Sequence, residues 1–216
     1  MRLFGVLLVI AGCHFEGMPP GGTPDGSTEP DMSPPATGMV LNWIANPALP
    51  GQVTDKVEVT DAVFQLEHLQ LVSDAGADAR TTRSRYQLEW KDGAAPAQEV
   101  FPDAPVAVYQ RISLDLRPDV QPPFAYQVLG VWHDEDEDKP FKIADPVLLE
   151  IPIDCSVSLP AGSSVSITVR LDLRDALNSV DFKTLQEING VLVLSTAGPM
   201  LSQFRSKLTR AFHSDD

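Results

Sequence analysis

Apolar and polar residues alternate with a period of two over much of this chain. The clearest case is 165–173, where Val, Ile, Val, Leu and Leu occupy every second position and polar residues stand between them. This spacing turns one face of a strand toward a core and the other toward water. The same pattern predicts strands at 40–44, 57–59, 86–90, 111–117, 126–132, 147–153 and 191–194.

One long apolar run, 63–72, changes phase near His68. A strand that carries a β-bulge accounts for the shift, and a short helix is the alternative. A histidine inside an apolar strand is more often a hydrogen-bonded structural residue than a catalytic base. We therefore interpret His68 as structural.

Turn sequences separate the predicted strands at short intervals. Asp92-Gly93, Pro118-Asp119 and 159–162 are examples, and no long helical pattern intervenes before the last part of the chain. Frequent strands divided by such turns favour an antiparallel β-sandwich. The predicted fold class is therefore mainly β.

Two late segments have helical spacing. Residues 175–188 place apolar side chains irregularly, as two short helical turns would. Pro199 then opens a segment in which Leu201, Phe204, Leu208 and Phe212 lie on one stripe, and proline suits the first turn of a helix. We expect a short C-terminal helix packed on the sandwich, with a partner contact as the alternative use of that stripe.

The start of the chain has the layout of an export signal. Arg2 precedes the apolar residues 3–10, which are far fewer than the roughly 20 needed to span a bilayer as a helix. The following Ala11-Gly12-Cys13 resembles the lipobox of bacterial lipoproteins, although Ile10 stands where that family more often has leucine. The resemblance implies cleavage before Cys13 and acylation of this residue. The alternative is an ordinary secretory signal with an incidental cysteine.

Composition then divides the chain. Residues 1–12 are the predicted signal peptide, and 13–38 combine the lipidated cysteine with a linker rich in proline and glycine, a composition typical of disorder. The predicted β-sandwich domain covers 39–212, and 213–216 form a tail.

Cys155 is then left without a cysteine partner, so no disulfide is predicted, and we expect it to be a small buried apolar residue.

The order of these parts resembles a bacterial envelope domain of uncharacterised function that occurs in lipoproteins and is built as a β-sandwich. The similar features are 57–59 leading into 64–72, a segment that ends at Tyr109 before a strand, and Pro160-Ala161-Gly162 before a strand with 171–173 as Leu-Asp-Leu. Ala107 stands where the family usually has glycine. The resemblance implies the fold and no mechanism.

The net charge of the chain limits the classes of partner that we expect. The chain has 16 basic and 30 acidic residues, a net charge of −14. Nucleic acid and attraction to anionic lipid are disfavoured, because both depend on clustered lysine and arginine. The basic run 80–85 is the exception, and it either is solvated, pairs with acidic surface or binds an anionic saccharide.

The densest polar cluster, 133–139, contains Asp134, Asp136 and Asp138 at the 1-3-5 spacing of a calcium loop. An EF-hand would need glycine at Lys139 and glutamate at Asp145, so the cluster departs from that motif. We expect a solvated loop and treat the three aspartates as weak calcium candidates.

No catalytic or cofactor motif occurs in the sequence, and His14, His68, His133 and His213 are scattered. We therefore predict a non-catalytic binding or structural module that is lipid-anchored at the cell envelope. We expect it at the outer membrane of a Gram-negative bacterium, because His14 and Phe15 follow the anchor and neither is the aspartate that resembles an inner-membrane retention signal in enterobacterial lipoproteins. Its partner would be an envelope protein or a glycan. The alternatives are a calcium-stabilised adhesion-type module and an enzyme whose site is assembled from distant residues.

Overall fold

The computed structural model describes residues 38–76, 78–80, 84–121, 123–135, 137–195 and 198–215, with Arg80 described by its backbone alone. The predicted lipidation residue Cys13, the signal peptide and nearly all of the linker lie outside this part of the chain. Asp136 does too. Among the described residues, no helix is both long and apolar enough to cross a membrane.

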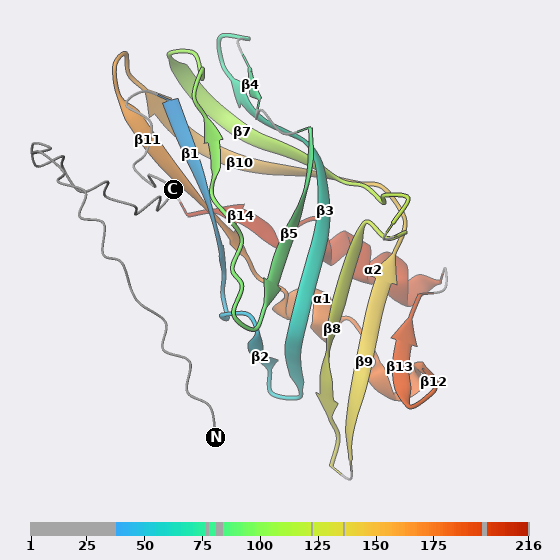
Figure 1. Ribbon diagram of the computed structural model, residues 1–216. Coiled ribbons are helices and arrows are strands. Elements are labelled where there is room, and N and C mark those ends of the chain that lie inside the picture. Colours follow the sequence, from blue (N-terminus) through green and yellow to red (C-terminus); the bar gives the residue numbers. More distant parts are fainter. Residues whose placement is uncertain are drawn as a thin grey trace, which may run out of the picture. The chain divides into compact units, whose positions relative to one another are not determined.

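Two β-sheets pack together, which confirms the predicted mainly β sandwich (Figure 1). The smaller sheet has the order β14 (Phe212–Ser214), β11 (Ser164–Leu171), β1 (Gly38–Ala45) and β6 (Glu99–Phe101). The larger sheet has the order β10 (Leu149–Leu159), β7 (Ala107–Leu116), β3 (Val57–Ser73), β8 (Tyr126–His133), β9 (Asp138–Asp145), β13 (Val191–Leu194) and β12 (Gln186–Ile188). Three short strands also pair with β3: β2 (Gly51–Thr54), β4 (Ala79–Arg80) and β5 (Arg85–Lys91).

Aromatic rings join the two sheets in the core. Phe212 of the smaller sheet meets Phe64 of the larger one edge to face, with ring centroids 5.4 Å apart, and meets Trp43 of its own sheet at 6.5 Å. Phe64 also contacts Trp90 of β5 at 6.0 Å. All four rings are at most 6% exposed. The inward face of each strand therefore supplies the apolar surface that the alternation predicted.

Strand β3 organises the larger sheet. Its first half pairs with β8 and its second half with β7, while β2, β5 and β4 follow one another along its other side. The partner changes at Gln65, whose N–H donates to Ala125 O at 2.8 Å and whose carbonyl accepts from Arg117 N at 2.9 Å. The connection between β7 and β8 leaves the sheet at this position.

A bulge interrupts β3 at His68, as the change of phase predicted. The pairing with β7 shifts between Glu67 and Gln70, and His68 has a φ of 54°. The extra residue turns the imidazole outward, where its side chain is 63% exposed and Nδ1 lies 2.9 Å from Asp115 Oδ2. The alternative of a short helix is therefore wrong.

Two of the described strand pairs are parallel. β1 pairs with β11 in parallel over its whole length, and β13 pairs in parallel with the middle of β9. The other described pairs are antiparallel. Alternation along one strand reports which residues face the core and carries no information about the direction of the neighbour.

The late segments fold into short helices and two further strands. α1 spans Arg174–Asn178, a single 3₁₀ turn, η1, spans Phe182–Thr184, and α2 spans Pro199–Leu208. The predicted helical region therefore ends early, because Gln186–Ile188 form β12. Leu201, Phe204 and Leu208 are buried on α2 as predicted, whereas Phe212 belongs to β14. That strand also includes His213 and Ser214, which the sequence placed in a tail.

Close approach explains the one glycine inside β8. A Cβ at Gly130 would lie 2.0 Å from the carbonyl oxygen of Glu58 and within 2.8 Å of the Phe141 ring. Any larger side chain would push β3 and β9 away from β8. Gly130 therefore lets the Phe141 ring lie across the sheet, where it meets Phe182 with centroids 5.0 Å apart.

Candidate functional site

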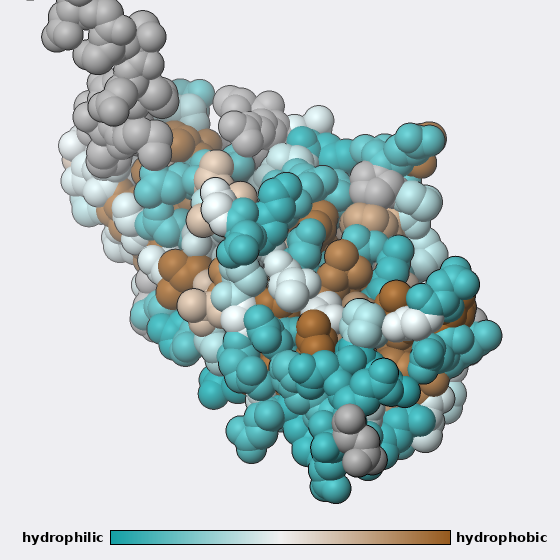
Figure 2. All heavy atoms as spheres, turned by 60° about the horizontal axis from the view of Figure 1, so that its bottom comes forward, coloured by the Kyte–Doolittle hydropathy of each residue, from teal (hydrophilic) through white to brown (hydrophobic). Residues whose placement is uncertain are grey.

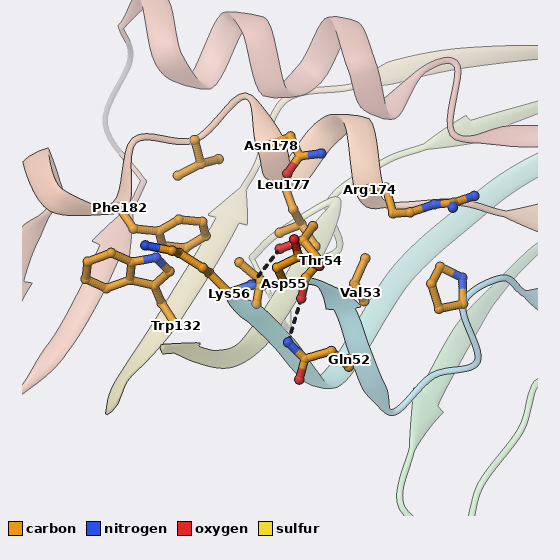
Figure 3. A pocket seen from close by; sticks show the side chains of 13 residues that line it. Gln52, Val53, Thr54, Asp55, Lys56, Trp132, Arg174, Leu177, Asn178 and Phe182 are labelled. Carbon is orange, nitrogen blue, oxygen red and sulfur yellow. Dashed lines mark hydrogen bonds between the residues drawn. The ribbon is translucent and has the colours of Figure 1, made fainter. Parts of the chain in front are cut away.

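A concave surface lies between α1, η1 and the turn that joins β2 to β3 (Figure 3). We call it the α1 hollow, and its volume is about 760 Å³. Volumes of this size are typical of small-molecule sites. Its described lining is Pro47, Gln52, Val53, Thr54, Asp55, Lys56, Val57, Trp132, Arg174, Leu177, Asn178, Val180 and Phe182.

An aromatic pair closes one end of the α1 hollow. The rings of Trp132 and Phe182 are stacked, with centroids 5.9 Å apart and an interplanar angle of 10°. Figure 3 shows the two side chains next to each other. Trp132 is 6% exposed and Phe182 5% exposed, so both rings form part of a buried apolar floor. Val57 and Leu177, which are also buried, continue this apolar floor toward α1.

The rim of the hollow is polar and is shaped by the β2–β3 turn. Gln52 Nε2 donates to Thr54 O at 2.5 Å, and the backbone N–H of Lys56 donates to Thr54 Oγ1 at 3.4 Å. Both bonds hold the turn in one geometry. The side chains of Asp55 and Lys56 are exposed and form no ion pair with another described residue.

Helix α1 supplies the opposite rim. Arg174 and Asn178 stand one helical turn apart, so both side chains lie on the same side of the helix. Asp172 fixes the Arg174 guanidinium, whose Nε is 3.0 Å from each carboxylate oxygen. That pairing also holds the pKa of Asp172 below its ordinary value. The carboxylate therefore stays ionised.

The lining of the α1 hollow is rich in hydrogen-bonding groups. Its described members offer amide, hydroxyl, ammonium and guanidinium groups, with Asp55 as the carboxylate. No histidine or cysteine is among these described lining residues to activate the Thr54 hydroxyl. The arrangement can donate and accept several hydrogen bonds above an apolar floor.

The surface that comes forward in Figure 2, on the side of the β2–β3 turn and the β8–β9 hairpin, is mainly hydrophilic. Its apolar residues occupy separate spots between charged and polar ones. Scattered apolar residues are normal on a soluble surface. This face therefore offers hydrogen-bonding groups rather than a broad apolar contact area.

The acidic cluster forms the tip of the β8–β9 hairpin, where each described calcium candidate meets a basic side chain. Asp138 Oδ1 is 2.7 Å from His133 Nδ1, and Asp134 Oδ1 is 3.6 Å from Lys183 Nζ. Asp136 lies outside the described residues. Within the described ranges, no three His, Cys, Asp or Glu side chains are grouped to hold a metal. The calcium site stays a prediction.

The remaining candidates lie elsewhere. The Sγ of Cys155 is 3.7 Å from Tyr109 O, and the half-buried residue packs against the core. Arg85, at the end of the basic run, pairs with Glu67 at 2.9 Å and Asp119 at 3.0 Å, as the acidic-surface alternative expects. Residues 81–83 of that run lie outside the described part.

One buried polar group was missed by the sequence analysis. Asp145 is fully buried, accepts from Tyr126 Oη at 2.9 Å and from Arg205 Nη2 at 2.8 Å, and is bonded by Arg205 Nε as well. It thereby fastens α2 to β8 and β9. The sequence places this aspartate between the apolar end of a predicted strand and Pro146. The same arrangement is typical of a turn, so it did not indicate a buried carboxylate.

No family model, curated protein or solved structure matches this chain. The resemblance to an envelope domain of lipoproteins therefore stays a prediction. The functional argument rests on the chain's own residues.

Proposed function

We propose that this protein is a lipid-anchored, non-catalytic binding module of the cell envelope, and that the α1 hollow holds its ligand. The observation that carries the proposal is the hollow itself, about 760 Å³ with a polar rim above an apolar floor. Binding sites commonly combine these properties. Acylation of Cys13 would hold the protein at the outer membrane of a Gram-negative bacterium, with residues 14–38 as the tether.

A saccharide unit of an envelope glycan fits this lining better than a protein surface. Sugar rings carry many hydroxyl groups, which Gln52, Thr54 and Asn178 can bind as donors and acceptors. Their C–H faces can contact the apolar floor formed by Val57 and Leu177. A protein partner would instead favour a broad contact area, and the side shown in Figure 2 is mainly hydrophilic.

Binding can be tested with the full chain, purified in detergent, on an array of bacterial envelope glycans. We expect retention of one glycan class by the wild type and its loss in a Gln52→Ala/Asn178→Ala variant. The control is Gln203→Ala, because this exposed glutamine on α2 does not line the hollow. If the wild type retains no glycan, or if the control loses binding equally, the glycan proposal is wrong.

The anchor is tested separately by fractionating cells that express the full chain with a C-terminal tag. The wild type should sediment with outer membranes, whereas Cys13→Ser should shift to the soluble fraction. Several acyl chains make such attachment durable, since each buried methylene contributes about 0.8 kcal/mol. Globomycin should cause the uncleaved precursor to accumulate. An unchanged precursor size together with a membrane-bound Cys13→Ser protein would contradict the anchor.

A further inference from the structure

Most described basic side chains of this acidic protein are neutralised by a carboxylate. Those with an ion pair are Arg85, Lys91, Arg117, Lys139, Arg170, Arg174, Lys183 and Arg205. Lys207 and Arg210 form none with any described residue, although the chain carries 30 acidic residues. Both are exposed and both line the same hollow.

This second hollow, which we call the basic hollow, has a volume of about 440 Å³. It adjoins α1, as the α1 hollow does, and Arg174 and Asn178 line both. Its described lining consists of Asp172, Arg174, Asp175, Asn178, Lys207, Arg210, Ala211 and His213.

The backbone holds the basic hollow in shape before any ligand arrives. The N–H of Asp172 donates to Ala211 O at 2.8 Å, which ties the start of α1 to the turn after α2. Next to this bond, β11 pairs with β14, and Arg170 lies opposite His213 in that pair. The backbone that carries Lys207, Arg210 and His213 is therefore fixed to β11 and to the start of α1, and a ligand need not order this backbone.

The charges inside the hollow do not cancel. Asp172 is already neutralised by Arg174, which leaves Asp175 facing Lys207 and Arg210. His213 adds further N–H donor capacity. The cations are not needed to cap α2 either. The carbonyls of Arg205, Lys207 and Leu208 already accept backbone N–H groups from Thr209, Arg210 and Ala211.

We propose that the basic hollow binds a phosphate group, either free or as a monoester on a glycan. Lys207 lies in the last turn of α2, Arg210 in the turn that follows it and His213 on β14, and all three line the hollow. A tetrahedral oxyanion presents oxygens in several directions and can accept from all three groups. Arginine and lysine both form strong charge-assisted bonds to phosphate. This site does not depend on the glycan proposed for the α1 hollow.

Phosphorus NMR titrations of the full chain, at constant ionic strength, test the site with inorganic phosphate and with glucose 6-phosphate. We expect saturable binding by the wild type and a loss of affinity of about tenfold or more in Lys207→Gln/Arg210→Gln. The matched control is Arg111→Gln/Lys142→Gln, which removes the same charge from two residues that also lack a described ion pair. Lys207→Gln alone, at an exposed position, gives a milder second variant.

The two probes separate the sources of the phosphate. Tighter binding of glucose 6-phosphate identifies a phosphorylated glycan, and equal binding identifies the free ion, so either result supports the site. Plain glucose, which carries no phosphorus, serves as the uncharged comparison by being added as a competitor, and it should leave both phosphorus titrations unchanged. The site is refuted if the wild type saturates with neither probe, or if the control variant loses as much affinity as Lys207→Gln/Arg210→Gln.

Discussion

Two clusters lie at the two ends of the β7–β8 connection, and each contains both acidic and basic side chains. One is buried in the protein and the other is on its surface. The buried clamp consists of Asp145, Tyr126 and Arg205, and it stands where the connection enters β8, since Ala125 N donates to Asp145 O at 2.7 Å. The surface cluster consists of Glu67, Arg85, Arg117 and Asp119, where the connection leaves β7.

The clusters have similar distances and different surroundings. Arg117 Nη1 lies 2.8 Å from Glu67 Oε2, and Arg205 Nη2 lies 2.8 Å from Asp145 Oδ1. The Arg117 and Glu67 side chains are 47% and 15% exposed, whereas those of Arg205 and Asp145 are 24% and 0% exposed. Water competes for the first pair and cannot reach the second carboxylate. Although the two distances are equal, we expect the buried pair to contribute more to the free energy of unfolding than the surface pair.

Replacing Asp145 should have the largest effect. Asp145→Ala leaves the Arg205 guanidinium and the Tyr126 hydroxyl without their buried acceptor, and we expect a loss of about 3 kcal/mol in the free energy of unfolding. Urea denaturation measures it. Asp154→Ala, at an exposed position on β10, is the control and should change stability little. A loss below about 1 kcal/mol would show that the clamp is weakly coupled to folding.

Removing one hydroxyl from the clamp should cost less. Burial raises the pKa of Tyr126, and the neighbouring Asp145 carboxylate adds to this, so the hydroxyl stays protonated and donates. Tyr126→Phe keeps the stacking on Phe204 at 5.8 Å and deletes that donor. We expect a loss of about 1–2 kcal/mol in urea denaturation.

A double-mutant cycle sharpens this second prediction. In the Asp145→Ala background, Tyr126→Phe should cost almost nothing, because the acceptor is already gone. Additive losses in the two single variants and the double variant would contradict a shared clamp.

The surface cluster should contribute less and respond to salt. Exposed ion pairs contribute about 0–1 kcal/mol and are screened, because the Debye length falls to about 3 Å at 1 M ionic strength. Glu67→Gln should therefore lower stability slightly in dilute buffer and have no measurable effect in 1 M NaCl. The loss caused by Asp145→Ala should persist in both. Equal salt sensitivity of the two variants would contradict the distinction between buried and exposed pairs.

The sequence predicted those parts of the fold that depend on local periodicity. The bulge at His68 followed from a shift of phase within one strand, and the first residue of α2 followed from Pro199. Phe212 was misplaced because the helical stripe continues past Leu208 at a helical interval, while the chain itself turns and pairs with β11. The parallel pairing of β1 with β11 joins residues far apart in the chain, and alternation holds no record of it.

Candidate sites were harder to predict than strands. The α1 hollow is assembled from β2, β8, α1 and η1, and no two of these elements share a motif in the sequence. Lys207 and Arg210 read as ordinary cations at a helix end. They became informative once the structure placed carboxylates beside most other basic side chains. Asp145 likewise needed its distant partner Arg205 to be recognised.

The smallest expected effect concerns Asp61. This carboxyl is partly removed from water, but in contrast to Asp145 no described arginine pairs with it to offset the cost of desolvation. Its Oδ1 is buried and has no hydrogen-bond partner among the described residues. Desolvation raises the pKa of Asp61, Glu89 adds to the increase and Lys91 opposes it.

A carboxyl whose pKa is raised by folding destabilises the protein once it ionises, so Asp61→Asn should increase stability at pH 7 by about 0.5 kcal/mol. The gain should vanish as the pH falls below the ordinary aspartate value of 3.8, because both folded and unfolded chains are then protonated. Thermal melts from pH 7 to pH 3 measure this, with Asp92→Asn, an exposed aspartate in the turn after β5, as the control. A loss of stability at pH 7 would mean that the attraction between Asp61 and Lys91 outweighs the cost of desolvation, and that a nearby cation compensates a half-buried carboxylate without a direct hydrogen bond.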